Sequence, residues 1–196
     1  MRYSQVTDWC HEMIRSQGRP GGFYIDATMG GGRDTLFLSK LAGEKGRVLA
    51  FDIQQEALDA IKALLQNSGM ADAEEERIRL ILDGHEHMDR YAGECTADVI
   101  CFNFGYFPGG DHRIATCAKT SIQAIEKGLG ILKPGGMMNL CIYSGGDTGF
   151  EEKEAVLAYL KGLPAKKYTV IVNEYYNRAN HPPMPVLIFK NEEEEQ

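Results

Sequence analysis

Polar residues surround a run of three glycines near the start of the chain, in a pattern that suits the binding of a nucleotide-like cofactor. The run YIDATMGGGRDT occupies residues 24–35, with its glycines at positions 30 to 32. Glycine can adopt positive φ and lets backbone amides approach a ligand, while Asp34 and Thr35 suit the first turn of a following helix. The residues expected to bind the cofactor at this turn are Asp26, Thr28, Gly30, Gly32, Asp34 and Thr35.

Two cofactors are compatible with this turn. A dinucleotide-binding turn has the pattern G-x-G-x-x-G, and Thr35 occupies the position of its third glycine. The carboxylate of Asp26, directly before the turn, suits S-adenosylmethionine, because the methionine part of that cofactor carries an ammonium group that needs an acceptor. The sequence therefore favours a methyl donor over NAD.

A second segment with chemical potential is FNFGYFPGGD, at residues 102–111. The side-chain oxygen of Asn103 and the exposed backbone carbonyls after it could accept the protons of an amino group and direct its lone pair. Tyr106 or Phe107 offers a flat face for a base or a cation. The pattern indicates a site for an amine, although a tight glycine-rich loop with packed aromatic residues would have the same composition.

Alternating apolar and amphipathic runs predict the elements that position these residues. The expected strands are 23–27, 47–52, 78–82, 97–103 and 137–143, the expected helices are 4–17, 34–41, 55–67, 116–132 and 151–163, and residues 133–136 form a turn. Residues 168–176 and 186–190 are expected to form a terminal antiparallel pair. This order predicts an α/β fold with a twisted, mainly parallel sheet of seven strands and helices on both faces.

Polar residues end several of the predicted strands, and ligands of such sheets bind outside the carboxyl ends of the strands. Asp52 ends the second strand, where it could accept hydrogen bonds from ribose hydroxyls in a methyltransferase or in a dehydrogenase. Asp83 follows the third strand, where the adenine of a methyl donor would lie; its other interpretation is a helix N-cap. The further expected cofactor contacts are Asp52, Ile53, Gln54, Asp83, Gly84, His85 and Asn103.

Length and composition predict one soluble domain over residues 1–190, followed by an acidic disordered tail at 191–196. The chain has 196 residues, 43% of them hydrophobic, and no run long enough to span a bilayer. Its start lacks the apolar core of a signal peptide, and its five cysteines form no C-x-x-C pair, so a cytoplasmic location is expected. His85 and His87 lack a third convergent ligand, so no metal site is expected.

The formal net charge of -7 argues against a protein that holds nucleic acid by bulk electrostatics alone. Four of the acidic residues, Glu192 to Glu195, lie in the terminal run. The acidic balance therefore remains compatible with a local basic face on the folded part of the chain.

Four blocks of the sequence, at residues 26–38, 51–54, 103–111 and 180–183, resemble one bacterial family. That family was long labelled as rRNA methylases, and its characterised members are tRNA methyltransferases that convert 5-aminomethyl-2-thiouridine at the wobble position to the 5-methylaminomethyl form. The resemblance runs from about residue 5 to residue 190. The order of Asn103, two residues and Tyr106 is also similar to the Asn-Pro-Pro-Tyr motif of amino-directed methyltransferases. One departure is that the family usually has Tyr, His, Gly, His where this chain has Tyr143, Ser144, Gly145 and Gly146.

The resemblance implies a Rossmann-like class I methyltransferase that uses S-adenosylmethionine and transfers the methyl group to an amine by direct displacement. The catalytic residues that it implies are Asn103 as acceptor, Tyr106 as aromatic wall, and Tyr143 or Asp111 as relay for the departing proton. The implied partner is tRNA, and the residues expected to contact it are Phe104, Gly105, Tyr106, Arg113, Arg178 and His181.

Three alternatives stay open at this point. The chain could methylate another RNA site or a small-molecule amine, or it could be an NAD-dependent oxidoreductase, which Thr35 and Asp83 disfavour.

The apolar strand edges near residues 168–190 could also pair across a two-fold axis to form a homodimer, although nothing in the sequence requires one.

Overall fold

The computed structural model describes residues 5–70, 77–106, 114–144 and 149–192. The elements, in chain order, are α1 (Val6–Gln17), β1 (Phe23–Asp26), α2 (Arg33–Ala42), β2 (Arg47–Asp52), α3 (Gln55–Asn67), β3 (Ile78–Leu82), η1 (His85–Arg90), β4 (Ala97–Phe104), α5 (Ala118–Ile131), β5 (Leu132–Ile142), α6 (Gly149–Lys161), β6 (Tyr168–Val172) and β7 (Met184–Lys190). The predicted alternation of strands and helices is therefore present, and most predicted bounds lie within two residues of the observed ones.

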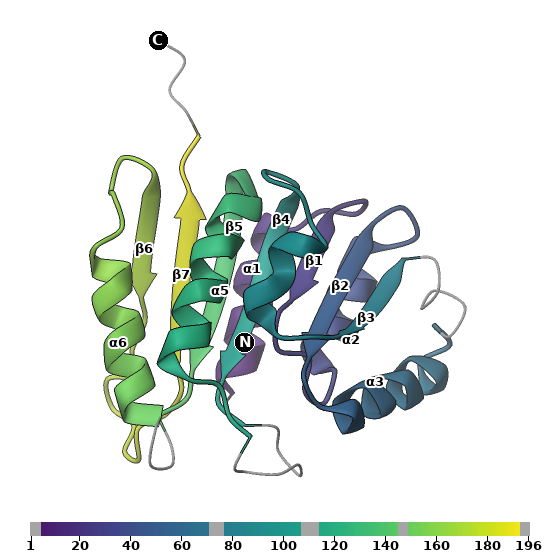
Figure 1. Cartoon of the computed structure of the whole chain (residues 1–196), viewed down its shortest axis with the longest axis horizontal. Coiled ribbons are helices and arrows are strands. Elements are labelled where there is room, and N and C mark those ends of the chain that lie inside the picture. Colours follow the sequence, from purple (N-terminus) through teal and green to yellow (C-terminus); the bar gives the residue numbers. More distant parts are fainter. Residues whose placement is uncertain (1–4, 71–76, 107–113, 145–148, 193–196) are drawn as a thin grey trace.

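All of these strands belong to a single seven-stranded sheet with the order β3-β2-β1-β4-β5-β7-β6 (Figure 1). The strands from β1 to β5 pair in parallel, and β7 runs antiparallel to both β5 and β6. The mainly parallel sheet with a terminal antiparallel pair is thus confirmed. The chain moves outward from β1 to β3 on one side and from β4 to β5 on the other, which opens a crevice at the carboxyl ends of β1 and β4.

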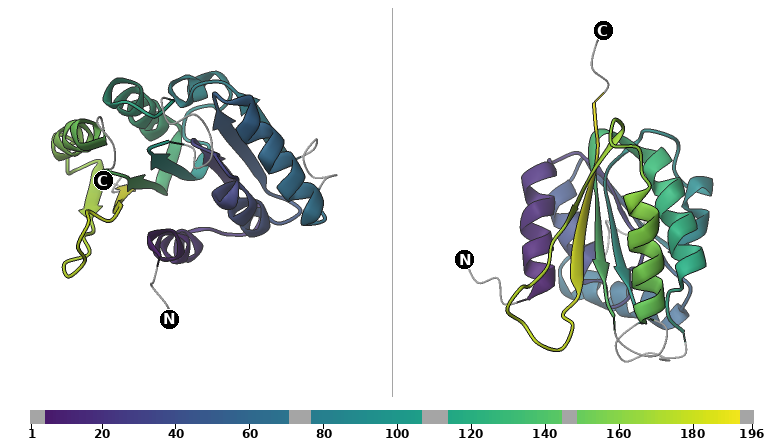
Figure 2. Two further views of the ribbon diagram at one scale, coloured as in Figure 1. Left: turned by 90° about the horizontal axis from the view of Figure 1, so that it is seen from below. Right: turned by 90° about the vertical axis from the view of Figure 1, so that its left-hand side faces the viewer.

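Helices cover both faces of the sheet (Figure 2). On one face, α1, α2 and α3 pack against the sheet through buried residues such as Ile14, Leu38 and Ile61. On the other face, η1, α5 and α6 pack against it through residues such as Met88 and Ile125. Because both faces are buried, β1 and β2 consist of nearly continuous apolar runs, as expected for central parallel strands.

The structure corrects two predicted bounds and adds one element. Strand β5 begins at Leu132 instead of Met137, because Leu132 pairs with Ala97 before the expected Lys-Pro-Gly-Gly turn, which the strand accommodates with a shift of register and a positive φ at Gly135. Strand β6 ends at Val172 rather than at residue 176. The 3-10 helix η1 was not predicted, because six residues are too few for a helical periodicity to be recognised.

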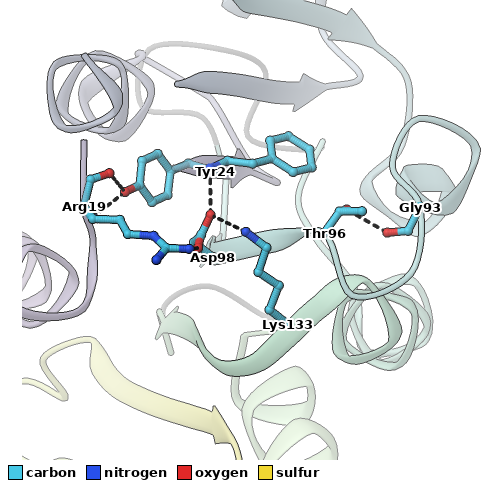
Figure 3. Close-up of polar contacts among 7 residues, drawn as sticks. Arg19, Tyr24, Gly93, Thr96, Asp98 and Lys133 are labelled. Carbon is cyan, nitrogen blue, oxygen red and sulfur yellow. Dashed lines mark hydrogen bonds and ion pairs between the residues drawn. The ribbon is translucent and has the colours of Figure 1, made fainter. Parts of the chain in front are cut away.

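A carboxylate that is only 12% exposed, that of Asp98 on β4, ties the segment after α1 to β1 and β5 at the amino ends of the strands (Figure 3). It accepts hydrogen bonds from the backbone amide of Phe23 at 2.8 Å and from Lys133 Nζ at 2.9 Å, and an Arg19 guanidinium nitrogen lies at 3.3 Å. The hydroxyl of Tyr24 connects to both backbone polar groups of Arg19. Burial acts to raise the pKa of Asp98, but these donors and positive charges outweigh it, so the pKa is lowered.

Replacing Asp98 with asparagine is expected to lower the free energy of unfolding by about 2 kcal/mol at pH 7, because hydrogen bonds to a charged group contribute about 1.5–3 kcal/mol. The pKa of Asp98 is lower in the folded than in the unfolded chain. Its stabilising contribution is therefore present above the unfolded value, near pH 4, and is lost as the pH falls through the folded value. Urea unfolding of both proteins at a series of pH values between 7 and 3.5 should show the difference shrinking toward acid.

The matched control is Asp89→Asn, because Asp89 forms an exposed ion pair with Lys127 at 2.9 Å. Exposed pairs contribute little, so this change should stay within about 1 kcal/mol of the parent. An equal loss of stability in the two variants would show that the less exposed Asp98 site has no special role.

Candidate active site

A cavity of about 870 Å³ opens at the carboxyl ends of the parallel strands. Its wall combines the turns that follow the parallel strands with segment 114–117, the start of α1 and the β6–β7 loop. The side chains expected to bind a cofactor and those expected to bind an amine therefore face a single space. Cavities of this size accommodate ligands of the dimensions of a nucleoside cofactor.

The glycine turn forms one wall of the cavity and is tied to the end of β2. Asp52 Oδ2 accepts a hydrogen bond from Gly30 N at 3.0 Å, and Asp52 Oδ1 accepts one from Gln54 N at 2.9 Å. Gly32 has a φ of 79° at the N-cap of α2, and a Cβ there would lie 2.1 Å from Ile61 Cδ1. Only glycine fits this position, which holds the backbone close to the space that a ligand would occupy.

Two of the predicted cofactor residues, Asp26 and Thr35, are fully buried and lie behind the cavity wall. Asp26 Oδ2 accepts a hydrogen bond from Thr35 Oγ1 at 2.6 Å, and Asp26 Oδ1 accepts one from Thr28 N at 3.2 Å. Burial, and next the nearby charge of Asp34, raise the pKa of Asp26. The structure therefore gives no support to the expected direct contact of Asp26 and Thr35 with the cofactor. These two side chains stabilise the glycine turn from behind the cavity wall. The cavity itself is lined by the other four predicted residues of this turn, Thr28, Gly30, Gly32 and Asp34.

The segment after β3 supplies the opposite wall. Asp83 Oδ1 accepts hydrogen bonds from Gly84 N and from His87 Nδ1, both at 2.8 Å, and its Oδ2 accepts one from Tyr91 Oη at 2.9 Å. The bond from His87 lowers the pKa of Asp83. Gly84 is the N-cap of η1, so the N-cap interpretation of Asp83 is wrong. Asp83 lines the cavity with both carboxylate oxygens engaged, and its contact with adenine stays a prediction.

His85 and Ile53 complete the expected adenine side. His85 is buried, packs edge-on against Phe102 and Phe104, and has its pKa lowered by burial, so its ring is neutral. Ile53 is 61% exposed although it lines the cavity, which leaves an apolar surface for a flat ring to cover. Gln54 and Gly84 line the same wall.

Asn103 lies at the carboxyl end of β4 and lines the cavity. Its backbone amide donates to Thr28 Oγ1 at 2.6 Å, and its side-chain Nδ2 donates to Asp34 Oδ2 at 2.8 Å. A carboxylate can only accept, so the nitrogen of the amide must face Asp34. The amide orientation is therefore determined, and Oδ1 is the acceptor that this side chain can offer to a ligand.

Aromatic side chains form the outer part of the cavity. Tyr106 is 47% exposed and Tyr143 is 38% exposed, and both line it together with Gly105. Burial raises the pKa of Tyr143, so its phenol stays protonated at neutral pH. Phe104 is fully buried and packs against Phe102 outside the cavity wall, which gives no support to its predicted substrate contact.

The β6–β7 loop supplies part of the rim. His181 lines the cavity and meets the ring of Phe150 edge-on at 5.4 Å, whereas Arg178 is outside the wall, with its guanidinium 4.3 Å from the ring centre of Tyr175. Ser144, which stands where the family usually has a histidine, is buried in the wall, and its Oγ has no hydrogen-bond partner among the residues described. The predicted sites Asp111 and Arg113, and also Gly145 and Gly146, lie outside the described residues.

Sequence reasoning missed three residues around the site. Thr7 lines the cavity from α1, and His11, one turn further along the same helix, contacts Asp34. Their spacing of four residues on a helix was a usable signal that they share a face. Buried Glu152 of α6 accepts hydrogen bonds from Thr116 Oγ1 at 2.8 Å and Ser121 Oγ at 2.6 Å. No local pattern marked Glu152.

Within the ranges that the structure describes, no three His, Cys, Asp or Glu side chains gather as they would around a metal ion. No helix in that part of the chain combines the length and apolar character needed to cross a membrane. The groups that line the cavity suit a nucleoside cofactor: a glycine turn at the start of α2, a carboxylate at the end of β2 and an exposed apolar side chain at Ile53.

Comparisons with known proteins identify the family of this chain. Residues 48–189 match the family described as "Putative rRNA methylase". A curated chloroplast protein of Arabidopsis thaliana, a tRNA (mnm(5)s(2)U34)-methyltransferase, is 34% identical over 191 residues, which cover 94% of this chain and 68% of that protein.

Two solved structures are similar to this chain in both sequence and fold. A protein of Clostridium thermocellum described as "putative rRNA-methylase" is 43% identical, with a TM-score of 0.91 over 97% of this chain and 100% of the other. A protein of Streptococcus mutans described as "a putative methyltransferase", solved in complex with SAH, is 34% identical, with a TM-score of 0.84 over 95% of this chain and 98% of the other.

Proposed function

This chain belongs to the family described as "Putative rRNA methylase", and from that premise we propose that it methylates the 5-aminomethyl group of 2-thiouridine at the wobble position of tRNA. It is a class I methyltransferase with S-adenosylmethionine as its cofactor. That assignment sets aside the nicotinamide-dependent oxidoreductase. The choice of tRNA and of the wobble amine is supported by the curated relative, whose name specifies that nucleoside.

The observation that carries the proposal is the orientation of the Asn103 amide. Asp34 holds Nδ2 at 2.8 Å, so Oδ1 is the group that can accept a hydrogen bond from a ligand in the cavity. An amine that donates one N–H to Oδ1 has its lone pair directed away from that oxygen, ready to attack a methyl carbon. A partly buried hydrogen-bond acceptor of this kind favours an amine as the group that receives the methyl.

The residues that would hold the cofactor are the glycine turn with Asp52 on one side and Ile53 with His85 on the other. When bound, the sulfonium of the cofactor supplies an electrophilic methyl group. The chain's own contribution is positioning, which can lower a barrier by about 7–11 kcal/mol in favourable cases. The cavity also shields the amine from water, and this favours its neutral, nucleophilic form because burial disfavours a cation.

The departing proton must leave the amine nitrogen after the attack. Because the pKa of Tyr143 is raised, its phenol can relay that proton only if it passes its own proton onward. Asp111 is the second relay proposed.

We place the reaction in the cytoplasm and in one catalytic domain over residues 1–190, in keeping with the sequence prediction.

The nucleobase would lie between the aromatic side chains of Tyr106 and Tyr143, which are half-exposed and suited to stacking. His181 lines the same opening and could contact a phosphate or a base edge. The proposal assigns Arg113 and Arg178 to the surrounding RNA backbone. Dimerisation of the chain stays a prediction.

The test is nucleoside mass spectrometry of tRNA that carries 5-aminomethyl-2-thiouridine, incubated with the protein and methyl-labelled S-adenosylmethionine. We expect one labelled methyl group on that nucleoside and none on matched tRNA that lacks the aminomethyl group. Label on another nucleoside would redirect the assignment to a different RNA site. Absence of RNA label, with cofactor binding measured in the same sample, would favour a small-molecule amine.

A further inference from the structure

We infer that His11 is a positioning residue for methyl transfer: it holds Asp34, which in turn fixes the amide of Asn103. His11 lies on α1, and its contact with Asp34 spans 23 residues of sequence. It does not line the cavity, so it acts through Asp34 rather than by touching a ligand. The kinetic part of this inference rests on the proposed function, whereas the orientation of the Asn103 amide can be measured without it.

The first step is the contact between His11 and Asp34. His11 Nε2 lies 2.6 Å from Asp34 Oδ1, and the two side chains are only 17% and 11% exposed. Burial acts to raise the pKa of Asp34, but the bonds from His11 and Asn103 and the charge of Arg33 outweigh it and lower the pKa. Asp34 is therefore an anion that only accepts, and His11 Nε2 must be the donor.

The second step is the division of the Asp34 carboxylate between two donors. Oδ1 accepts from His11 and Oδ2 accepts from Asn103 Nδ2 at 2.8 Å. Because each carboxylate oxygen of Asp34 accepts a hydrogen bond from a different side chain, the orientation of the carboxylate plane is fixed. Without His11, Oδ1 loses its donor, and the carboxylate can rotate and release Asn103.

The third step is the placement of His11 itself. Its ring stacks on Phe37 of α2, with centroids 3.9 Å apart and planes 5° from parallel. Phe37 follows Asp34 by three residues on the same helix, so one face of α2 carries both partners of His11. The line of contacts from Phe37 through His11 and Asp34 to Asn103 therefore joins α1, α2 and β4.

The experiment separates the hydrogen bond from the stacking by comparing three substitutions. His11→Phe keeps a ring for Phe37 but has no donor, His11→Ala removes both, and His11→Gln restores an N–H donor. Since a misplacement of about 1 Å can cost about 10²-fold in rate, we expect kcat to fall about 10- to 100-fold in the first two variants, with partial recovery in the glutamine variant. Because Asp34 itself lines the cavity, some change in cofactor affinity is expected, but kcat should fall by a much larger factor than cofactor affinity or KM changes.

The control is Glu12→Ala, which changes the neighbouring residue of α1, part of an exposed ion pair with Arg15, and should leave kcat unchanged. The inference is overturned if His11→Phe keeps the parent kcat. It is also overturned if all three His11 variants lose cofactor affinity and thermal stability together with rate, since that is the result of a merely structural role.

A measurement that needs no substrate separates this inference from the proposed function. In protein labelled with ¹⁵N-asparagine, the side-chain NH₂ of Asn103, assigned by its absence in Asn103→Ser, should be protected from exchange in the parent and exchange faster in His11→Phe. If the parent methylates no RNA but this difference is seen, the proposed substrate fails and the positioning role stands. Unchanged Asn103 exchange in His11→Phe removes the positioning role, whatever the substrate.

Discussion

Alanine at position 103 is expected to lower kcat for methyl transfer by about 10²- to 10³-fold, the range found when one preorganised hydrogen-bond partner of a transition state is removed. Asn103 offers a single oriented acceptor, since its nitrogen is held by Asp34 and its backbone amide by Thr28. Alanine keeps the backbone bond to Thr28 but removes the acceptor. Single-turnover rates and calorimetric cofactor binding should show the rate falling far more than the affinity.

Two further variants sharpen this test. Asn103→Asp keeps the shape but removes the donor to Asp34 and sets two carboxyl groups against each other, so it should be impaired although an acceptor oxygen is present. Asn67→Ala, at the exposed end of α3, is the control and should be unaffected. Normal turnover in Asn103→Ala would remove Asn103 from the mechanism.

The second large effect is expected at Gly32. Gly32→Ala should weaken cofactor binding by about 10²-fold or more, because the residue has a φ of 79° and a new Cβ would meet Ile61 Cδ1 at 2.1 Å. Strain of this kind costs about 1–3 kcal/mol, and the clash adds to it. The glycine turn must shift, which moves the backbone that lines the cavity. Calorimetry with S-adenosylmethionine measures the loss, and thermal unfolding measures the accompanying strain.

Gly43→Ala is the matched control, because Gly43 ends the same helix with a φ of 62° but a Cβ there has open space around it. It should lose some stability through backbone strain and keep its cofactor affinity. Adding Ile61→Val to Gly32→Ala removes the clashing Cδ1 atom and should restore part of the binding. Equal cofactor affinities in the two glycine variants would contradict a specific role for the turn.

Short-range pattern determined most of the fold. The strands β2 and β3 and the helix α3 have the predicted bounds. A strand or helix that is buried on one or both sides has apolar residues at regular spacing, and this spacing is visible in the sequence. The errors occur where a distant partner decides the conformation. Leu132 reads as the end of a helix, yet it pairs with Ala97 and becomes the first residue of β5.

The candidate site was predicted less completely. Thr28, Gly30, Asp52 and Asn103 line one cavity, as expected from strands that end at the same edge of a sheet. Phe104 does not line it, because neighbouring residues on a strand point to opposite faces, and Asn103 already occupies the cavity side.

The sequence by itself determined the order of elements, the edge of the sheet where the ligand residues gather, and the family. Only the tertiary structure decided that Asp26 and Thr35 brace the turn from behind and that His11 supports Asp34. The physical reason is the range of the interactions involved. Periodicity and turn chemistry act between near neighbours in sequence, whereas a hydrogen bond between α1 and α2 depends on how two helices lie on one sheet, which no local pattern records.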